Sequence, residues 1–391
     1  MPLSKRVKNL KNNPVDSAFK FAEKFPQAIS LAGGTPQFGL PQTSLQTICE
    51  ALKSNPNIVR YSAYAQGDPE LRNLIAEDLS LEFARKVVPE EILITAGSTS
   101  SLFSAIQAFT DPGDEIALFS PHWSLYQDQC ALCGDKILEI PLSEENGWDF
   151  DKSKLLEKVS DKTRALIIAD PNNPTGTIFS TASKKMLIKV SHEKNINLIV
   201  DETYRHIIDS GSDYQSLGKL SEDIDAMMII RSFSKDFSMS GLRLGYIYSS
   251  KENIAKLSRI HTSINLFPST LSEELGKLLY RDKEKIVSNY SNRYTKLRQL
   301  VCSRLDKLPK LFQYVKPQGG FFVFPKYSLT MNSVDFFKLL LEAGIVVRPG
   351  IGFGLGGEKH IRISFVSNEE LINKAFDRIE KYFNHYGKGL K

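Results

Sequence analysis

Polar residues that could do chemistry follow directly after four apolar runs of the sequence. The four clusters are Gly97-Ser98-Thr99, Asp170 to Gly176 with Asn173 at its centre, Asp201-Glu-Thr-Tyr204, and Arg231-Ser232-Phe-Ser234-Lys235. They supply an acid, a phenol, a lysine and a helix start whose free N–H groups suit a phosphate. Ligands of α/β sheets bind at the carboxyl ends of the strands, so we expect these clusters to converge on one site.

The elements that must position these residues are seven short runs rich in Ile, Leu and Val. They cover 92–95, 115–119, 136–140, 165–170, 197–201, 227–232 and 244–249. Fully apolar strands of this length suit a sheet that is covered on both faces, and helical patterns lie between the runs. The sequence therefore predicts an α/β fold, with a three-layer large domain built on a seven-stranded, mostly parallel sheet.

The pattern changes after about residue 285. A long charged helix over 283–306 is followed by a helix–strand alternation that runs to the end of the chain. This indicates a smaller α+β domain, and we expect the first 45 residues to pack near it. The predicted organisation is a large domain over 46–285 and a small domain formed by both chain ends, 1–45 and 286–391.

Composition excludes several classes of protein. The 391 residues carry 50 basic and 45 acidic side chains, a net charge of +5 that is too mild and too scattered to predict a nucleic-acid partner. No apolar run approaches the ~20 residues of a membrane helix. Four cysteines do not make a disulfide scaffold, so a cytoplasmic location is expected. Cys130 and Cys133 form a CxxC without a second pair, which predicts a helix end capped by Gly134 and no metal site.

A resemblance adds to this interpretation. The stretch Ser232-Phe-Ser-Lys235-Asp-Phe-Ser-Met-Ser-Gly-Leu-Arg243-Leu-Gly245 fits a lysine-attachment signature at each constrained position. With the Asn173 and Asp201 motifs in the right order, the sequence resembles the fold type I pyridoxal-phosphate enzymes of the class I/II aminotransferase family. The resemblance spans the chain from Gly34 to Arg362. It implies pyridoxal 5′-phosphate as cofactor, an amino acid and a 2-oxo acid as substrates, and a homodimer with shared active sites.

The resemblance assigns the chemistry to a few residues. Lys235 would form the Schiff base with the cofactor aldehyde and then carry the proton of the substrate Cα. Asp201 would pair with the protonated pyridine nitrogen and keep the ring an electron sink. Tyr204 and Asn173 would hydrogen-bond the 3′ oxygen of the ring. From the local residues alone, Asp201 could equally be a helix N-cap.

Phosphate binding is implied for a second group of residues. Arg243 would hold the phosphate with its planar fork. Ser232 and Ser234 would lie near it, and the amides of Ser98 and Thr99 would lie opposite. Taken alone, the Ser98–Thr99 segment is more typical of helix capping.

The remaining implied residues bind the cofactor ring or the substrate. Trp123 would stack on the pyridine ring, with a core tryptophan as the alternative. Arg362 would clamp the substrate α-carboxylate, with Gly34 and Asn173 beside it. Tyr61 would reach the phosphate in the neighbouring subunit, although the spacing also admits Tyr64. The glycine-rich run 349–357 lacks the strand–turn–helix order of a dinucleotide fingerprint and is predicted to be a mobile loop over the site.

Three functions remain open at this point. The first is a transaminase, the second a lyase, synthase or decarboxylase on the same scaffold, and the third a non-catalytic protein that kept the fold. The resemblance implies that an enzyme for dicarboxylates would bind the distal carboxylate with a lysine at 98–100 or an arginine near 261–267, and neither segment contains that residue. With Phe38, Trp123, Phe267 and Phe353 as expected walls, this predicts a neutral substrate, aromatic or large aliphatic. Glutamate could still be a donor, and an aspartate/glutamate-type enzyme is the alternative.

Overall fold

One large sheet organises the molecule in a computed structural model that describes residues 3–8, 10, 20–209 and 211–386. Its strands stand in the order β2-β9-β8-β7-β6-β3-β4-β5. Their bounds are β2 Ile92–Thr95, β3 Glu115–Ser120, β4 Lys136–Ser143, β5 Asp149–Phe150, β6 Thr163–Ala169, β7 Asn197–Asp201, β8 Met227–Ser232 and β9 Gly245–Tyr248. The α/β class is confirmed.

The sheet has eight strands where the sequence predicted seven. The additional strand, β5, has only two residues and pairs antiparallel with the end of β4, Phe150 opposite Leu142. Two residues cannot display a strand pattern, so β5 was not predictable. Strands β8, β7, β6, β3 and β4, neighbours in that order, run parallel to one another, whereas β9 lies antiparallel to both β2 and β8.

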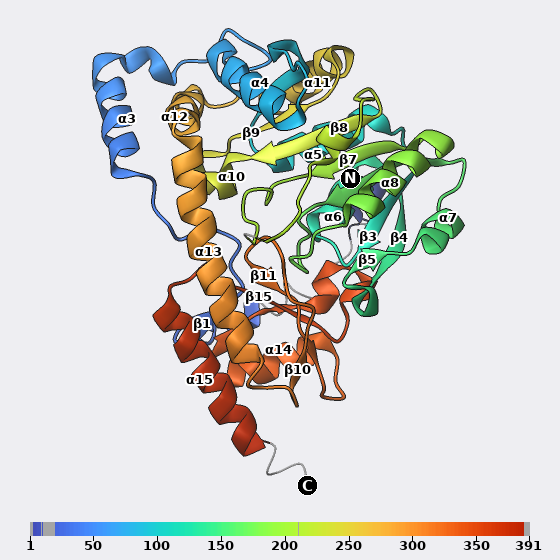
Figure 1. Cartoon of the computed structure of the whole chain (residues 1–391), viewed down its shortest axis with the longest axis vertical. Helices are drawn as coiled ribbons and strands as arrows, with labels where there is room; N and C mark the ends of the chain where they lie inside the picture. The colour runs from blue at the N-terminus through green and yellow to red at the C-terminus, as the bar shows by residue number, and fades with distance from the viewer. Residues whose placement is uncertain (1–2, 9, 11–19, 210, 387–391) are drawn as a thin grey trace.

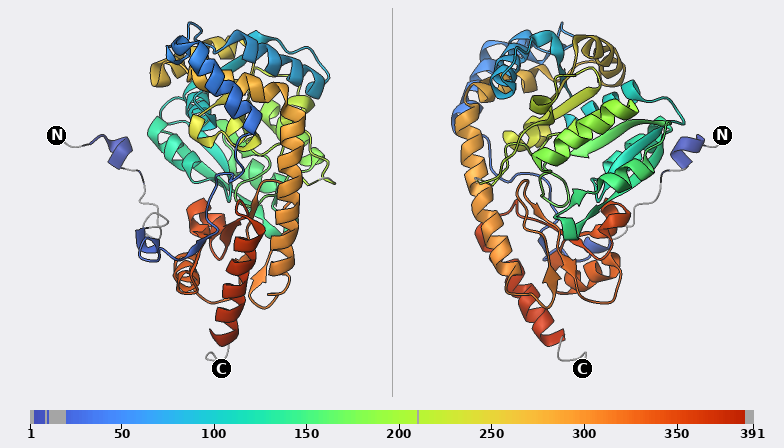
Figure 2. Two further views of the ribbon diagram at one scale, coloured as in Figure 1. Left: turned by 90° about the vertical axis from the view of Figure 1, so that its left-hand side faces the viewer. Right: turned by 45° about the vertical axis from the view of Figure 1, so that its right-hand side comes forward.

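Helices cover both faces of this sheet, because successive strand residues point to opposite sides. Ile167 and Ile199 face one hydrophobic cluster, while Ile168 and Val200 face the other. The first face is covered by α5 (Ser98–Phe109), α6 (Leu125–Cys133) and α11 (Lys251–Asn265), and the second by α4 (Pro69–Phe83), α8 (Thr181–Lys194), α9 (Leu217–Leu220) and α12 (Thr270–Arg281). The result is the expected three-layer arrangement (Figure 2).

A long helix, α13 (Lys283–Leu305), runs from the region of α12 to a second group of elements (Figure 1). That group contains α14 (Ser333–Glu342), α15 (Glu369–Tyr386), and the short strands β10 (Phe312–Gln313), β11 (Phe322–Val323), β12 (Lys326–Tyr327), β13 (Ile345–Val346), β14 (Arg348–Pro349) and β15 (Ile361–Ser364). Strand β15 lies between β11 and β14 and pairs antiparallel with both.

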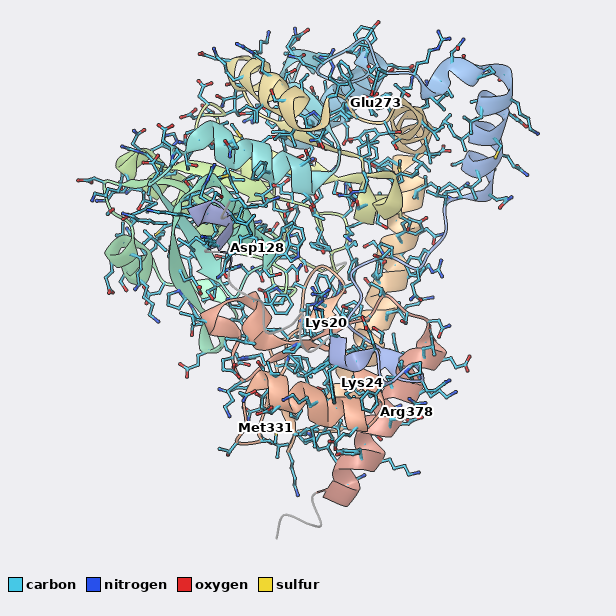
Figure 3. The ribbon with its side chains drawn as sticks, turned by 180° about the vertical axis from the view of Figure 1, so that it is seen from behind. Lys20, Lys24, Asp128, Glu273, Met331 and Arg378 are labelled. Carbon is cyan, nitrogen blue, oxygen red and sulfur yellow. The ribbon has the colours of Figure 1, made fainter. Side chains whose placement is uncertain are left out.

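Part of the N-terminal segment joins this second group, whereas helix α1 (Lys5–Lys8) lies against α6 of the large sheet, where Nη1 of Arg6 donates to the carbonyl of Leu132 at 3.1 Å. Strand β1 (Ile29–Ser30) pairs in parallel with β13, and Arg378 of α15 donates to the carbonyl of Gln27 at 3.3 Å. Figure 3 shows the region from behind, with Lys24 and Arg378 labelled. Of the segment 1–45 that we assigned to a small domain, residues 1–2, 9 and 11–19 lie outside the described residues. Helix α3 (Gln42–Ser54) begins at the end of this segment, but it contacts α12 and so lies with the large sheet and not with the second group.

A buried ion pair fixes the loop that carries Asn173. The Nζ of Lys184 on α8 lies 2.6 Å from Oδ2 of Asp170, and both side chains are almost fully excluded from solvent. Lys184 also donates to the carbonyl of Gln215 at 2.7 Å and lies over the ring of Tyr214. The other carboxylate oxygen of Asp170 accepts from the amide of Phe179 at 3.0 Å. The pair thereby ties the start of the Asn173 loop to a neighbouring helix.

We predict that Lys184→Met destabilises the fold by about 3–5 kcal/mol, because it leaves the Asp170 carboxylate buried without its cation. The measurement is the urea unfolding midpoint, with Lys185→Met as the matched control since Lys185 is exposed on the same helix. The double variant Asp170→Asn/Lys184→Met should recover part of the loss. Equal losses in Lys184→Met and Lys185→Met would contradict the role of the pair.

Candidate active site

A cavity of about 550 Å³ lies at the carboxyl ends of the parallel strands, where the sequence placed the site. It brings together every candidate from the large sheet and both candidates from the chain ends, Gly34 and Arg362. The predicted residues that line it are Gly34, Ser98, Thr99, Trp123, Asn173, Asp201, Tyr204, Ser232, Ser234, Lys235, Arg243 and Arg362. Tyr61 is not among the lining residues.

Lys235 stands at the centre of this cavity. It lies on the short helix α10 (Phe233–Asp236), which starts where β8 ends and is capped by Ser232, whose side chain accepts from the amide of Ser234. Its Nζ donates to the carbonyl of Gly34. Burial, and then the charges of Arg362 and Arg243, lower the pKa of Lys235 to about 8. About a tenth of the amine is therefore neutral and nucleophilic at pH 7, compared with well below a hundredth for an unburied lysine.

Asp201 ends β7 and is held from two sides. Its Oδ2 accepts from the hydroxyl of Tyr126 at 2.8 Å, and its Oδ1 accepts from the backbone amide of Thr203 at 3.0 Å. Burial raises the pKa of Asp201, and these hydrogen bonds oppose that rise. A cationic group facing the carboxylate would favour its charged form. Asp201 does not act as the cap of a regular helix, because the residues after it form turns.

The opposite end of the cavity is built to receive an anion. The first amides of α5, at Ser98 and Thr99, have no partner within the helix, because a helix leaves its first N–H groups unbonded. Arg243 lies beside Gly97, where a Cβ would come within 2.7 Å of its guanidinium Nη2. Gly97 also has a φ of +87°, which favours glycine. Because residue 97 has no side chain, the guanidinium can lie beside the start of α5, where its donors and the helix amides could bind one phosphate together.

Arg362 provides a second, separate anion site. Its Nη1 donates to Oδ1 of Asn173 at 3.0 Å and its Nη2 donates to the carbonyl of Ala32 at 2.9 Å. Its Nε is buried without a hydrogen-bond partner. Burial, with the charge of Arg348, lowers the pKa of Arg362 to about 9. A desolvated guanidinium with an unused donor fits a carboxylate ligand.

The expected aromatic walls are only partly found. Trp123 lines the cavity, with its ring edge-on to Tyr126. Phe353 is buried behind Arg362, 5.1 Å from the guanidinium carbon to the ring centre. Phe38 instead packs on Tyr294 and lines a different cavity, beside α15. Phe267 pairs with the ring of Tyr61, away from the lining residues.

The two candidate tyrosines lie on the surface of the single chain. Tyr61 is 80% exposed and Tyr64 is 52% exposed. Neither of them lines the cavity. Their assignment to a neighbouring subunit therefore stays a prediction.

Several residues of the site were not predicted. Tyr126, which donates to Asp201, lies in the first turn of α6 only three residues after Trp123, and this nearness in sequence is the signal that could have found it. His261, whose Nε2 accepts from the amide of Ala96 at 3.1 Å, has its pKa lowered to about 4 by burial and acts as a neutral acceptor below Thr95 and Gly97. Arg348 lines the cavity opposite Arg362 in the β14–β15 pair, a placement that only strand register reveals.

A buried ion network supports the site from beneath. Arg231, the last residue but one of β8, donates to both oxygens of Glu82 on α4 and pairs with Glu202, the residue after Asp201. Arg205 pairs with the same Glu82 at 3.0 Å. His206 contacts Asp236, the residue after Lys235, at 2.8 Å. The segments that carry Asp201 and Lys235 are thus joined to each other and to α4.

The remaining sequence candidates are structural. Cys130 and Cys133 are buried on α6, and Gly134 ends the helix in the left-handed region as predicted. Burial raises the pKa of both thiols. Within the part of the chain that the structure describes, no group of three or more His, Cys, Asp or Glu side chains is arranged to hold a metal ion. Among the same residues, no helix has the length and apolar character needed to cross a bilayer.

Comparison with known proteins agrees with this geometry. The family model "Aminotransferase class I and II" matches residues 26–379. The chain is 31% identical to an aspartate aminotransferase of Pyrococcus horikoshii, over 97% of this chain and 96% of that protein. It is 30% identical to aromatic-amino-acid aminotransferase 2 of Thermococcus litoralis, over 97% and 98% of the two chains. A solved double mutant of the Thermus thermophilus aspartate aminotransferase superposes with a TM-score of 0.92 at 28% identity, covering 98% of this chain and 100% of that one. The chain belongs to the class I and II aminotransferases.

Proposed function

We propose that this aminotransferase binds pyridoxal 5′-phosphate in the cavity around Lys235 and moves an amino group between a neutral L-amino acid and a 2-oxo acid. The observation that carries the proposal is the meeting of three groups in one cavity: a lysine of lowered pKa, a buried carboxylate, and a desolvated arginine. Both relatives named above are aminotransferases, which favours transamination over the lyase, synthase and decarboxylase alternatives.

The lining residues fit the cofactor that class I and II aminotransferases use. The α5 amides and Arg243, with Ser232 and Ser234, would hold the phosphate. Asp201 would face the ring nitrogen, Trp123 would cover the ring, and Tyr204 and Asn173 would meet its 3′ oxygen. The chemistry that the group supplies when bound is an aldehyde that takes up an amino group and a protonated ring that withdraws electrons.

The protein's own part in the reaction is to position groups and to move one proton. Arg362 and Asn173 hold the substrate α-carboxylate, so that the Cα–H faces Lys235. The neutral Nζ of Lys235 takes that proton and later returns it. Burial keeps the Nζ at a pKa of about 8, close to the range in which an amine can both accept and donate a proton. The hydrogen bond from Tyr126 keeps the Asp201 carboxylate in a fixed orientation.

The substrate is argued from charge. We propose a neutral donor, aromatic or large aliphatic, for one half-reaction and glutamate for the other. Trp123 and Phe322 give the cavity apolar walls. Arg348 is a cation that the sequence did not place there, and it favours the aspartate/glutamate type as the second candidate. The relatives include one named for aspartate and one for aromatic amino acids, in keeping with both.

We also propose a homodimer with shared sites. Around Tyr61 and Tyr64 the surface exposes further large apolar side chains, Val59, Ile264 and Leu266. Such a patch is typical of a protein interface. It would bring a tyrosine of one subunit to the phosphate end of the other site, and a solution mass near 44.0 kDa would contradict it. The four cysteines, all unpaired, fit the cytoplasmic location that we propose.

We predict that Lys235→Ala abolishes turnover and the visible absorbance of the bound cofactor while leaving the thermal unfolding midpoint within a few degrees. For the wild type, the rate at which the apoprotein takes up the cofactor should rise with pH, with a midpoint near 8, since only the neutral amine reacts. An unburied lysine would instead give a midpoint of ~10.4. Stopped-flow absorbance measures this rate. Turnover that persists in Lys235→Ala would refute the catalytic assignment.

We predict that Arg348→Met lowers kcat/KM for 2-oxoglutarate by about tenfold to a hundredfold and changes that for 4-methyl-2-oxopentanoate by less than about threefold, because only the first has a second carboxylate to lose a charged partner. The measurement is a panel of neutral and dicarboxylate donors and acceptors. If aspartate is the best wild-type donor by more than tenfold over phenylalanine, leucine and methionine, the enzyme is of the aspartate type and the proposed neutral substrate is wrong.

A further inference from the structure

The glycine-rich run that the sequence predicted to be mobile is held in place. Residues 350–357, here called the glycine loop, form two short 3₁₀ turns, η5 (Gly350–Phe353) and η6 (Leu355–Gly357). The loop belongs to the chain segment between β14 and β15, but η6 contacts β3 and β4 of the large sheet. It therefore bridges the two groups of elements that enclose the cavity.

Three hydrogen bonds make this bridge. The amide of Leu355 donates to Oε2 of Glu139 on β4 at 3.0 Å. The amide of Gly356 donates to Oγ of Ser120 at 3.1 Å, and the amide of His122 donates to the carbonyl of Phe353 at 2.8 Å. The bond to Glu139 is the charge-assisted one and is the strongest kind of the three.

Glu139 is itself oriented for this contact. Its other oxygen, Oε1, accepts from Nε2 of Gln127 on α6 at 2.9 Å. The loop approaches so closely that a Cβ on Gly354 would lie 2.8 Å from Oγ of Ser120 and 3.0 Å from Oε2 of Glu139. Gly354 also has a φ of +95°. Glycine is required there by space and by backbone conformation together.

What the loop presents to the site is the ring of Phe353. Phe353 is 2% exposed, and the guanidinium carbon of Arg362 lies 5.1 Å from its ring centre and 4.2 Å from that of Phe322. This enclosure removes water from Arg362 and so strengthens its attraction for a carboxylate. If the loop moved away, the guanidinium would lose one of its two aromatic covers.

We propose that Glu139 is a positioning residue of this enzyme: by holding the amide of Leu355 it keeps Phe353 over Arg362 and thereby sets the affinity for the substrate α-carboxylate. This rests on the proposed function, which gives that carboxylate to Arg362. Glu139 does not touch the substrate. Glu139 influences substrate binding through Phe353 and Arg362, and it leaves the positions of Lys235 and Asp201 unchanged.

The test compares Glu139→Ala with Glu139→Gln, which keeps an acceptor oxygen for Leu355, and with Glu145→Ala, an exposed carboxylate on the turn after β4. We expect Glu139→Ala to raise KM for the amino donor and for the 2-oxo acid about 5- to 20-fold, with kcat within about twofold, since binding is lost equally in ground and transition states. Glu139→Gln should keep most of the wild-type affinity that Glu139→Ala loses, and Glu145→Ala should have the KM and kcat of the wild type.

Amide hydrogen exchange of the cofactor-free protein is the second readout, and it does not depend on turnover. In Glu139→Ala the amides of Leu355 and Gly356 should exchange at least about tenfold faster, while those of the large sheet stay unchanged. The proposal is overturned by an unchanged KM, by a kcat loss without a KM rise, by equal effects in the Gln and Ala variants, or by unchanged exchange. If the wild type transaminates no amino acid, the proposed function is refuted. The hydrogen-exchange rates of Leu355 and Gly356 would still show whether Glu139 holds the loop.

Discussion

The site depends on the buried ion network around Arg231. This guanidinium is almost fully excluded from solvent, and it is held between Glu202, the neighbour of Asp201, and Glu82 of α4. Two carboxylates close to it raise its pKa well above the usual value, so it stays charged. Separating a buried charge of this kind from a partner costs about 3–5 kcal/mol. This charge consequently fixes the end of β8, the turn after β7 and one covering helix relative to each other, and with them Lys235 and Asp201.

The cavity above this network is lined by more positive than negative side chains. Arg243, Arg348, Arg362 and Lys235 line it together with one carboxylate, Asp201. Positive charges so close together repel one another, and the charges of Arg362 and Arg243 add to burial in lowering the pKa of Lys235. A dianionic phosphate and a carboxylate ligand would relieve it. The same repulsion that makes the lysine a good nucleophile thus prepares the cavity for its ligands.

Much of this was predictable from the residues alone. Buried parallel strands have a clear apolar signature, and chemistry-bearing residues stand next to strand ends, so the sheet, its three layers and the convergence of Asn173, Asp201 and Lys235 followed from local pattern. The two-residue strands were invisible, because a pattern needs more than two positions. Arg348 and Glu139 were missed for another reason: their roles come from strand register and from a loop that crosses between distant segments, and neither leaves a local trace.

The aromatic walls show the same limit. The sequence offers many phenylalanines, and nothing local distinguishes Phe38, which packs on Tyr290 and Tyr294, from Phe353, which covers Arg362. Composition predicts that such rings are buried. Which neighbour each ring meets is decided by tertiary packing.

The short pairing of β1 with β13 has a consequence for how the protein is made. Ala32, beside β1, accepts hydrogen bonds from Arg348 and Arg362, which lie 316 and 330 residues further along the chain. A ribosome adding roughly 5–20 residues per second needs about 15–60 seconds to cover that distance. Throughout this interval the segment with Gly34 has no strand to join. The last strand of the large sheet, β9, ends at Tyr248, so that sheet can be complete before β13 and β15 are made. The part of the cavity around Gly34 and Arg362 is therefore the last to form, after the part that the large sheet builds around Asp201 and Lys235.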